Sequence, residues 1–145
     1  MHINPEQKEA VIEMIHSYVQ FVGLKLTDAY DALKQSWTWR IGSATIHVYI
    51  ETMISGGYSR DYLRIFSPLM QIPTTNELAF YRHLLEANDS SLGVKLSLLN
   101  DWVFATYERD IRGMDYDELS TCISDLEWWA DKLDDELKAK FPNAY

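Results

Sequence analysis

The side chains best suited to catalysis or metal binding are few in this sequence and lie far apart. Its four histidines stand at positions 2, 16, 47 and 83, without the short spacing of a zinc site. His83 is followed by Leu84, Leu85 and Glu86, so the H-E-x-x-H pattern of zinc proteases is absent. Neither glycine-rich phosphate-binding pattern, G-x-G-x-x-G or G-x-x-x-x-G-K, occurs. We therefore expect no enzymatic activity, no metal and no cofactor.

The remaining candidates for chemistry also have simpler structural interpretations. Cys122 is the single cysteine, so no disulfide forms within the chain, and it falls near the apolar stripe of an expected helix. Asp131, Asp134 and Asp135 lack the spacing of a calcium loop. His47 lies on the less apolar face of an expected strand, where partial burial would make it sensitive to pH. A surface histidine without a role is the more common case.

Two adjacent tryptophans, Trp128 and Trp129, indicate a binding surface. Successive residues on a helix point about 100° apart, so one core cannot bury both rings. On a helical wheel Trp129 borders the apolar stripe, whereas Trp128 lies opposite it, near Asp125 and Lys132. An exposed tryptophan in a polar field is typical of an interface anchor. We therefore predict that Trp128, Asp125 and Lys132 bind a partner, and that the surrounding acids favour a basic or polar one.

The sequence leaves two other interpretations of Trp128 open. The ambiguous segment 27–36 or the tail 141–145 folds over the ring, or the ring is exposed without a role. Burial under the chain's own residues would remove the argument for a partner.

Composition and charge exclude several classes of protein. With 145 residues, 47% of them hydrophobic and 24% charged, the chain suits a single globular domain spanning 1–145. Its first residues lack a signal peptide, and no stretch reaches the roughly 20 apolar residues of a membrane span. We expect a soluble, cytoplasmic protein without a membrane partner. The net charge is −9, with nine acids in residues 115–136 against Lys132 alone, so a nucleic-acid partner is not expected.

The N-terminal half predicts one helix followed by strands. Asn4, Pro5 and Gln7 fit a helix start, and Gly23 is a plausible stop. The segment 27–36 is ambiguous between a loop and a short helix. Period-two alternation then predicts three strands joined as an antiparallel meander. They cover residues 37–41, 44–51 and 62–66, with turns at Gly42-Ser43 and Gly56-Gly57, and Pro68 and Pro73 close the third.

The C-terminal half predicts a helix, two strands and a long last helix. Thr74 and Glu77 resemble a capping box before a helix over 76–88, as do Asp115 and Glu118 before the last helix. Residues 94–99 and 102–108 read as strands around a turn at Asn100-Asp101. The expected core stripe of the last helix is Leu119, Ile123, Leu126, Ala130, Leu133 and Leu137.

The middle helix carries more apolar surface than one core requires. Leu78, Tyr81 and Leu85 form its expected core stripe, while Phe80 and Leu84 lie on a different side. The element order α-β-β-β-α-β-β-α predicts an α+β fold, in which helices pack on an antiparallel sheet.

Several segments together resemble the YbjN-like family, whose folds are similar to those of type III secretion chaperones. The resemblance covers roughly residues 37–137. It is carried by the stretches W-x-W-R-I-G-S-A-T-I-H-V-Y-I (37–50), L-R-I-F-S-P-L (63–69), I-P (72–73), F-Y-R-H-L-L-E-A-N (80–88), K-L-S-L-L-N-D-W-V (95–103) and W-A-D-K-L-D-D-E-L (129–137). The family is described as bacterial sensory-transduction regulators, without an established enzymatic activity.

The resemblance implies a binding protein that forms a homodimer. Secretion chaperones dimerise and bind extended segments of client proteins, and their helix between the two strand groups tends to lie at the dimer interface. Phe80 and Leu84 fall on the matching helix here, so they are the expected dimer-interface residues.

The sequence therefore favours a non-enzymatic domain, chaperone-like or regulatory, that binds a partner protein through apolar anchors. The alternative is a small-ligand sensory module with a pocket between sheet and helices, which a concave apolar cavity would support. Exposed apolar patches on a well-packed domain would support the protein-binding hypothesis. An enzyme would need clustered titratable groups in a cleft.

Overall fold

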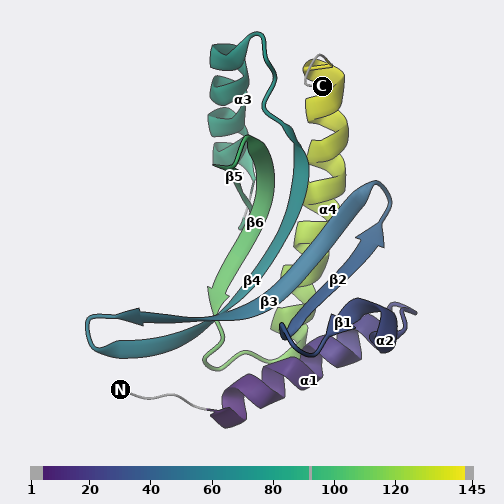
Figure 1. Cartoon of the computed structure of the whole chain (residues 1–145), viewed down its shortest axis with the longest axis vertical. Coiled ribbons are helices and arrows are strands. Elements are labelled where there is room, and N and C mark those ends of the chain that lie inside the picture. The colour runs from purple at the N-terminus through teal and green to yellow at the C-terminus, as the bar shows by residue number, and fades with distance from the viewer. Residues whose placement is uncertain (1–4, 92, 143–145) are drawn as a thin grey trace.

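A six-stranded antiparallel sheet forms the centre of the molecule, seen in a computed structural model that describes residues 5–91 and 93–142 (Figure 1). Its strand order is β1-β2-β3-β4-β6-β5. The strands are β1 (Tyr30–Asp31), β2 (Ser36–Ile41), β3 (Ala44–Ser55), β4 (Tyr58–Gln71), β5 (Lys95–Leu99) and β6 (Trp102–Asp110). This confirms the predicted α+β class with an antiparallel sheet.

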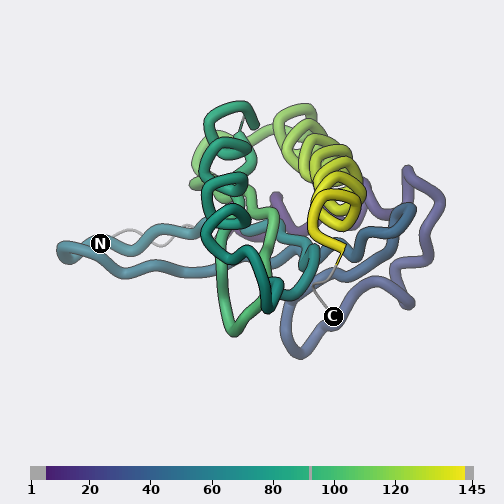
Figure 2. The backbone as a smooth tube through the Cα atoms, turned by 90° about the horizontal axis from the view of Figure 1, so that it is seen from above, coloured from purple at the N-terminus to yellow at the C-terminus, as the bar shows by residue number. Residues whose placement is uncertain are grey.

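The longer helices pack on one face of this sheet, which we call the inner face. The helices are α1 (Pro5–Phe21), α2 (Leu26–Ala29), α3 (Glu77–Ser90) and α4 (Tyr116–Lys140). Figure 2 shows α3 and α4 standing on the same side of the sheet, and α1 packs against α4 and β2. The expected order of long elements is confirmed, and the ambiguous segment 27–36 contributes the short elements α2 and β1. No helix in the described part of the chain is long and apolar enough to cross a membrane.

The predicted turns form, because glycine and asparagine tolerate the left-handed backbone that tight hairpins require. Gly42 has φ 57° between β2 and β3, and Gly56 and Gly57 have φ 58° and 83° between β3 and β4. Asn100 and Asp101 have φ 50° and 65° between β5 and β6. Each turn joins two antiparallel strands, as predicted.

The third strand differs from the prediction. We expected 62–66 with Pro68 as its end, but β4 continues from Tyr58 to Gln71 and passes through Pro68. The register against β6 shifts between Pro68 and Met70. A proline lacks a backbone donor, and such an irregularity is where a sheet tolerates one. Asn4, the predicted cap of α1, lies outside the described residues, and Gly23, with φ 86°, follows the end of α1 as expected.

The core lies between the inner face and α4. Trp37, Ile46, Leu63 and Ile65 alternate inward along β2, β3 and β4, each with 0% of its surface exposed. The predicted stripe of α4 is confirmed, because all six of its residues are buried. Asp115 caps α4, and its carboxylate accepts a hydrogen bond from the Glu118 backbone N–H at 2.8 Å.

Helix α3 presents the opposite face from the one predicted. Leu78 and Leu85, expected in the core, are 84% and 70% exposed, whereas Phe80 and Leu84 are 0% and 5% exposed. Tyr81, the third residue of the expected stripe, is partly buried against the core. The cause is a contact far along the chain. The Phe80 ring packs edge-on against Phe141 at the end of α4, with centroids 4.9 Å apart. Phe80 and Leu84 therefore fill the core of the chain itself, and their expected role at a dimer interface stays a prediction.

The predicted capping box of α3 is also wrong. The residue that precedes the helix is Asn76, with a left-handed backbone at φ 57° and ψ 36° and no side-chain hydrogen bond to the first turn. Because the helix begins at Glu77, Asn76 occupies the cap position and Thr74 lies two residues before it. Asparagine accepts this conformation more readily than most residues.

Candidate protein-binding surface

Trp128 lies on the outer side of α4, where 58% of its surface is exposed. Its ring meets the ring of Trp129 edge-on, with centroids 4.9 Å apart and an interplanar angle of 86°. Trp129 packs against the edge of the core, so the neighbouring tryptophans divide as the helical wheel predicts. The segment 27–36 does not bury Trp128. In the tail, Phe141 packs on α3 instead, and residues 143–145 lie outside the described part.

Lys132 and Asp125 flank Trp128 on the same side of α4. The Lys132 ammonium lies 4.9 Å from the centroid of the Trp128 ring and 5.1 Å from that of Trp129. A cation over an aromatic face is attracted by the ring's quadrupole. The same ammonium is 4.0 Å from the carboxylate of Glu136, one turn further along. Asp125 is exposed one turn before Trp128, so the structure brings the three predicted site residues together.

A buried polar cluster holds α4 in place behind this surface. Glu127 is 7% exposed, and its carboxylate accepts hydrogen bonds from the Tyr18 hydroxyl on α1 and from the Trp39 indole N–H on β2, the latter at 2.9 Å. Burial, together with the Glu127 carboxylate, raises the pKa of the Tyr18 phenol well above its usual value. Because Glu127 precedes Trp128 directly, it fixes the backbone that carries the exposed ring.

The next turn of α4 is attached to the β2–β3 hairpin. The Ser43 hydroxyl lies 3.3 Å from Asp131 and donates to Asp134 at 2.9 Å, and Lys138 pairs with Asp134 at 2.8 Å. A Cβ at Gly42 would come within 2.9 Å of the Asp131 carboxylate, and Gly42 has φ 57°, so both the contact and the backbone favour glycine here. The anchor residue Trp128 therefore stands on a helix that is fixed on both sides of it.

The Glu127 cluster was not predicted from the sequence, although one signal was present. Glu127 falls beside the apolar stripe of α4, and buried Trp and Tyr side chains need hydrogen-bond partners. The Glu127 carboxylate, at the border of the apolar stripe of α4, could have been predicted as the hydrogen-bond partner of Tyr18 and Trp39 in the expected core.

A second exposed apolar surface lies on α3, β5 and β6. Leu78 and Leu85 occupy one side of α3, while the edge hairpin exposes other apolar side chains. These are Leu98, Leu99 and Trp102, which are 46%, 62% and 37% exposed. Large exposed apolar side chains on neighbouring elements are typical of contact surfaces.

The sheet face opposite the helices, the outer face, carries aromatic rings and an ion-pair network. His47 stacks on Phe66 with centroids 4.8 Å apart, and burial lowers the pKa of its imidazole. Arg64 contacts Glu51 at 2.9 Å and Glu108 at 3.0 Å. The His47 ring is half-buried, which is the condition under which the sequence predicts sensitivity to pH.

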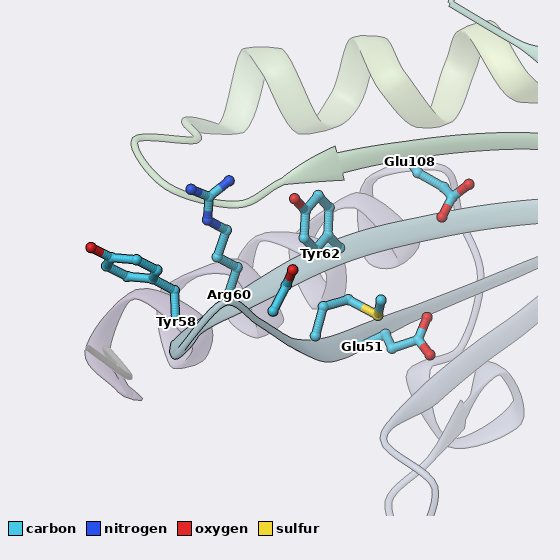
Figure 3. Close-up of a pocket in the computed structure, with 7 residues that line it drawn as sticks. Glu51, Tyr58, Arg60, Tyr62 and Glu108 are labelled. Carbon is cyan, nitrogen blue, oxygen red and sulfur yellow. The ribbon is translucent and has the colours of Figure 1, made fainter. Parts of the chain in front are cut away.

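A cavity of about 410 Å³ opens on this outer face, where the β3–β4 hairpin leaves the rest of the sheet (Figure 3). Tyr58, Arg60 and Tyr62 stand along β4 and line it with Glu51 and Glu108. The alternative hypothesis expected a pocket between sheet and helices, whereas this cavity lies on the other side of the sheet.

Cys122, one of the groups considered for chemistry, is a packing residue. Cys122 is buried, and its contact with the Tyr107 hydroxyl, together with burial, raises the pKa of that phenol to about 12. Among residues 5–91 and 93–142 there is no group of three or more His, Cys, Asp or Glu that could hold a metal ion.

Comparison with known proteins identifies the fold. No family model matches the sequence, and no curated protein matches it either. A chain of the HopA1–SchA chaperone–effector complex aligns with TM-score 0.65 and 10% identity, over 92% of this chain and 99% of that one. A chain of the ExsC–ExsE complex aligns with TM-score 0.65 and 10% identity, over 88% and 92%.

A further solved structure agrees with these two. The Yersinia pestis type III secretion chaperone SycH, solved in complex with a fragment of YscM2, aligns with TM-score 0.55 and 15% identity, over 83% of this chain and 97% of that one. The chain therefore has the fold of type III secretion chaperones, as the sequence predicted.

Proposed function

We propose that this chain is a chaperone-like or regulatory domain that binds a partner protein and acts by binding, not by catalysis. The observation that carries the proposal is Trp128, a large aromatic side chain with 58% of its surface exposed on a helix that is fixed from behind. The three similar structures are complexes of two proteins, and in two of them one protein is a chaperone, which supports the same class of function.

Trp128 has the properties of an anchor. Tryptophan is among the residues that contribute most to binding energy at interfaces, because a partner pocket can desolvate its large ring. Its support is rigid: Glu127 bonds to α1 and β2, and Asp131 lies against the β2–β3 turn. A rigid anchor loses little conformational entropy on binding.

The charge around Trp128 defines the chemistry of the partner. Nine acidic residues lie between 115 and 136, and Lys132 is the one basic residue among them. Lys132 already lies over the tryptophan rings and near Glu136. Asp125 and Asp135 are exposed on this helix. The partner segment that fits has an apolar pocket or side chain for Trp128 and basic or polar groups around it.

We further propose that the protein is a homodimer and belongs to the YbjN-like family. Both rest on the sequence resemblance between residues 37 and 137, with the chaperone fold as support. With Phe80 and Leu84 in the core, the side of α3 that remains for a partner is that of Leu78 and Leu85.

A capture experiment tests the protein-binding proposal. The tagged full chain and a Trp128→Glu variant are incubated with native lysate, and the retained proteins are identified by mass spectrometry. Leu33→Glu is the matched control, because Leu33 is 99% exposed in a turn outside α4. Circular dichroism first confirms that all three proteins are folded.

The expected result is a protein retained by wild type and by Leu33→Glu but lost with Trp128→Glu. Titration of the purified partner then gives the change in dissociation constant, for which a hot-spot tryptophan implies at least ~30-fold. Equal retention by all three proteins would exclude Trp128 as the anchor.

The cavity in Figure 3 favours a second candidate, the binding of a small ligand. Its volume of about 410 Å³ lies within the usual range for ligand sites. Among the described residues no carboxylate forms an ion pair with Arg60, so an anionic group next to an aromatic or aliphatic body fits there. A thermal-shift screen of small aromatic carboxylates tests this, with Arg60→Ala as the variant and Arg112→Ala as the control. A shift that is absent, or equal in both variants, would argue against it.

A further inference from the structure

The hairpin of β3 and β4 projects beyond the rest of the sheet as a two-stranded arm, residues 50–61 (Figures 1 and 2). Strand β2 pairs with β3 only from Ala44 to Tyr49, so within residues 5–91 and 93–142 no strand pairs with β3 on that side from Ile50 to Ser55. On the other side of the arm, β6 pairs with β4 only from Tyr62 onward. The arm therefore presents an unpaired strand edge to solvent.

The register of the hairpin shows which backbone groups face outward. Ser55 and Tyr58 flank the two-residue turn Gly56-Gly57, so they form a hydrogen-bonded pair, and such pairs alternate along the ladder. The intervening positions of β3 are Ile50, Thr52 and Ile54. Their N–H and C=O groups point away from β4, toward the open edge.

This edge lacks the features that normally protect an exposed strand. Proteins block such edges with lysine, proline, bulges or short strands. The pairing of β3 with β4 from Tyr49 to Ser55 has no register shift, and the segment contains neither lysine nor proline. Ile54 is 74% exposed and Met53 is 47% exposed. An apolar, regular edge of this kind is suited to the addition of another strand.

We infer that the open edge of β3 pairs with the same edge of a second copy of this chain, antiparallel and around a two-fold axis at Thr52. This deepens the homodimer part of the proposed function and rests on it. A two-fold axis at Thr52 aligns all outward-facing positions: Thr52 meets Thr52 of the second copy, and Ile50 meets Ile54 of the second copy. The interface is isologous and self-complementary, so the open edge of β3 is used up once two copies have paired.

Charge explains why a second copy fits at the arm better than elsewhere. Two chains of net charge −9 repel each other, but nine of the acids lie in residues 115–136 on or next to α4. Residues 50–61 contain only Glu51, Arg60 and Asp61, for a local charge of −1. The paired register sets Glu51 opposite Met53 of the second copy, and Arg64 already neutralises Glu51 at 2.9 Å.

Variants at the edge separate the backbone contribution from the side-chain contribution. Thr52→Pro removes the outward backbone N–H of Thr52. It removes no backbone hydrogen bond to β4, because the backbones of Thr52 and Asp61 form a non-hydrogen-bonded pair of the ladder. Thr52→Ala is the matched control: it loses the same hydroxyl bond to Asp61 but keeps the N–H. Ile54→Lys adds a charge at the exposed edge and serves as a second variant if the proline variant does not fold.

Sedimentation equilibrium on the full chain measures the dimer dissociation constant. We expect a dimer for wild type and Thr52→Ala, and at least ~10-fold weaker dimerisation for Thr52→Pro and Ile54→Lys. A dimer that survives both edge variants but dissociates with Leu78→Glu would place the second copy on α3 and overturn the inference. A wild type that stays monomeric would overturn the homodimer as well, whereas the Trp128 capture experiment would be unaffected.

Cross-linking tests the register directly. Opposed residues of a hydrogen-bonded pair have Cα atoms about 5.5 Å apart, within the range of a disulfide. The two Thr52 residues lie opposite each other in this register, so Thr52→Cys should give a covalent dimer under mild oxidation. The two Ser55 residues are six positions out of alignment, so Ser55→Cys should not. Equal cross-linking of both variants would reflect random collision and would contradict the two-fold register.

Discussion

Helices α3 and α4 pack on the same side of the sheet, yet the sequence identified the buried side of α4 and not that of α3. In α4 the buried stripe is opposed by charged and polar residues apart from Trp128, so one orientation removes far more apolar surface from water than the other. In α3 both sides are apolar, since Leu78 and Leu85 lie opposite Phe80 and Leu84. When two stripes compete, tertiary contacts decide which one is buried, and here the contact is with Phe141.

The largest difference between the two sides of α3 should appear in stability. Phe80→Ala removes a fully buried ring from its contact with Phe141 and should lower the free energy of unfolding by about 3–5 kcal/mol. Leu78→Ala, on the exposed side, should change it by less than about 0.5 kcal/mol. Urea titration followed by circular dichroism measures both. Similar losses in the two variants would contradict the orientation of α3.

This pair of helices shows how much of the fold the sequence determines. Local patterns were sufficient for the existence and order of the strands from β2 to β6, for their turns and for the stripe of α4, because alternation, glycine and capping act within a few residues. They did not give the full length of β3 and β4. The orientation of α3 depends on Phe141, sixty-one positions after Phe80, and a single sequence does not reveal that pairing. The path of β4 through Pro68 likewise depends on β6, which allows the irregular register.

The predictable part of the candidate site follows the same rule. Trp128, Asp125 and Lys132 lie on one helix, so a wheel was sufficient to bring them together. The Glu127 cluster joins three elements that are distant in sequence, and the open edge of β3 depends on where β2 begins. Neither the Glu127 cluster nor the open edge of β3 could be predicted from the sequence alone.

Within α4, the next largest effect should separate Glu127 from Asp125. Glu127→Ala leaves the Tyr18 hydroxyl and the Trp39 indole N–H without their buried acceptor and should destabilise by about 3 kcal/mol. Asp125→Ala, on the exposed side, should be neutral within about 0.5 kcal/mol. Thermal and urea unfolding of both variants test this. A neutral Glu127→Ala would show that the cluster does not hold α4.

A smaller effect should distinguish the starts of the two helices. Asp115→Ala removes a carboxylate that accepts from the Glu118 N–H and should cost about 1 kcal/mol. Thr74→Ala should cost less than about 0.3 kcal/mol, because α3 begins at a left-handed Asn76 without a side-chain cap. Asp115 and Thr74 are both exposed, so the difference in unfolding free energy measured by urea titration reflects the loss of a helix cap and not a difference in burial. A larger loss at Thr74 would indicate that the predicted capping box forms in solution.

The smallest effect on stability should accompany the largest effect on binding. Trp128→Ala gives up an edge-on contact with Trp129 and a cation near its ring, both at an exposed site, so it should destabilise by about 0.5 kcal/mol. Leu85→Ala on α3 should be equally mild. Partner capture then distinguishes them, because only the α4 variant should lose the partner. If Leu85→Ala lost it instead, the apolar side of α3 that the core leaves exposed would be the binding surface, and the acidic face of α4 would serve solubility alone.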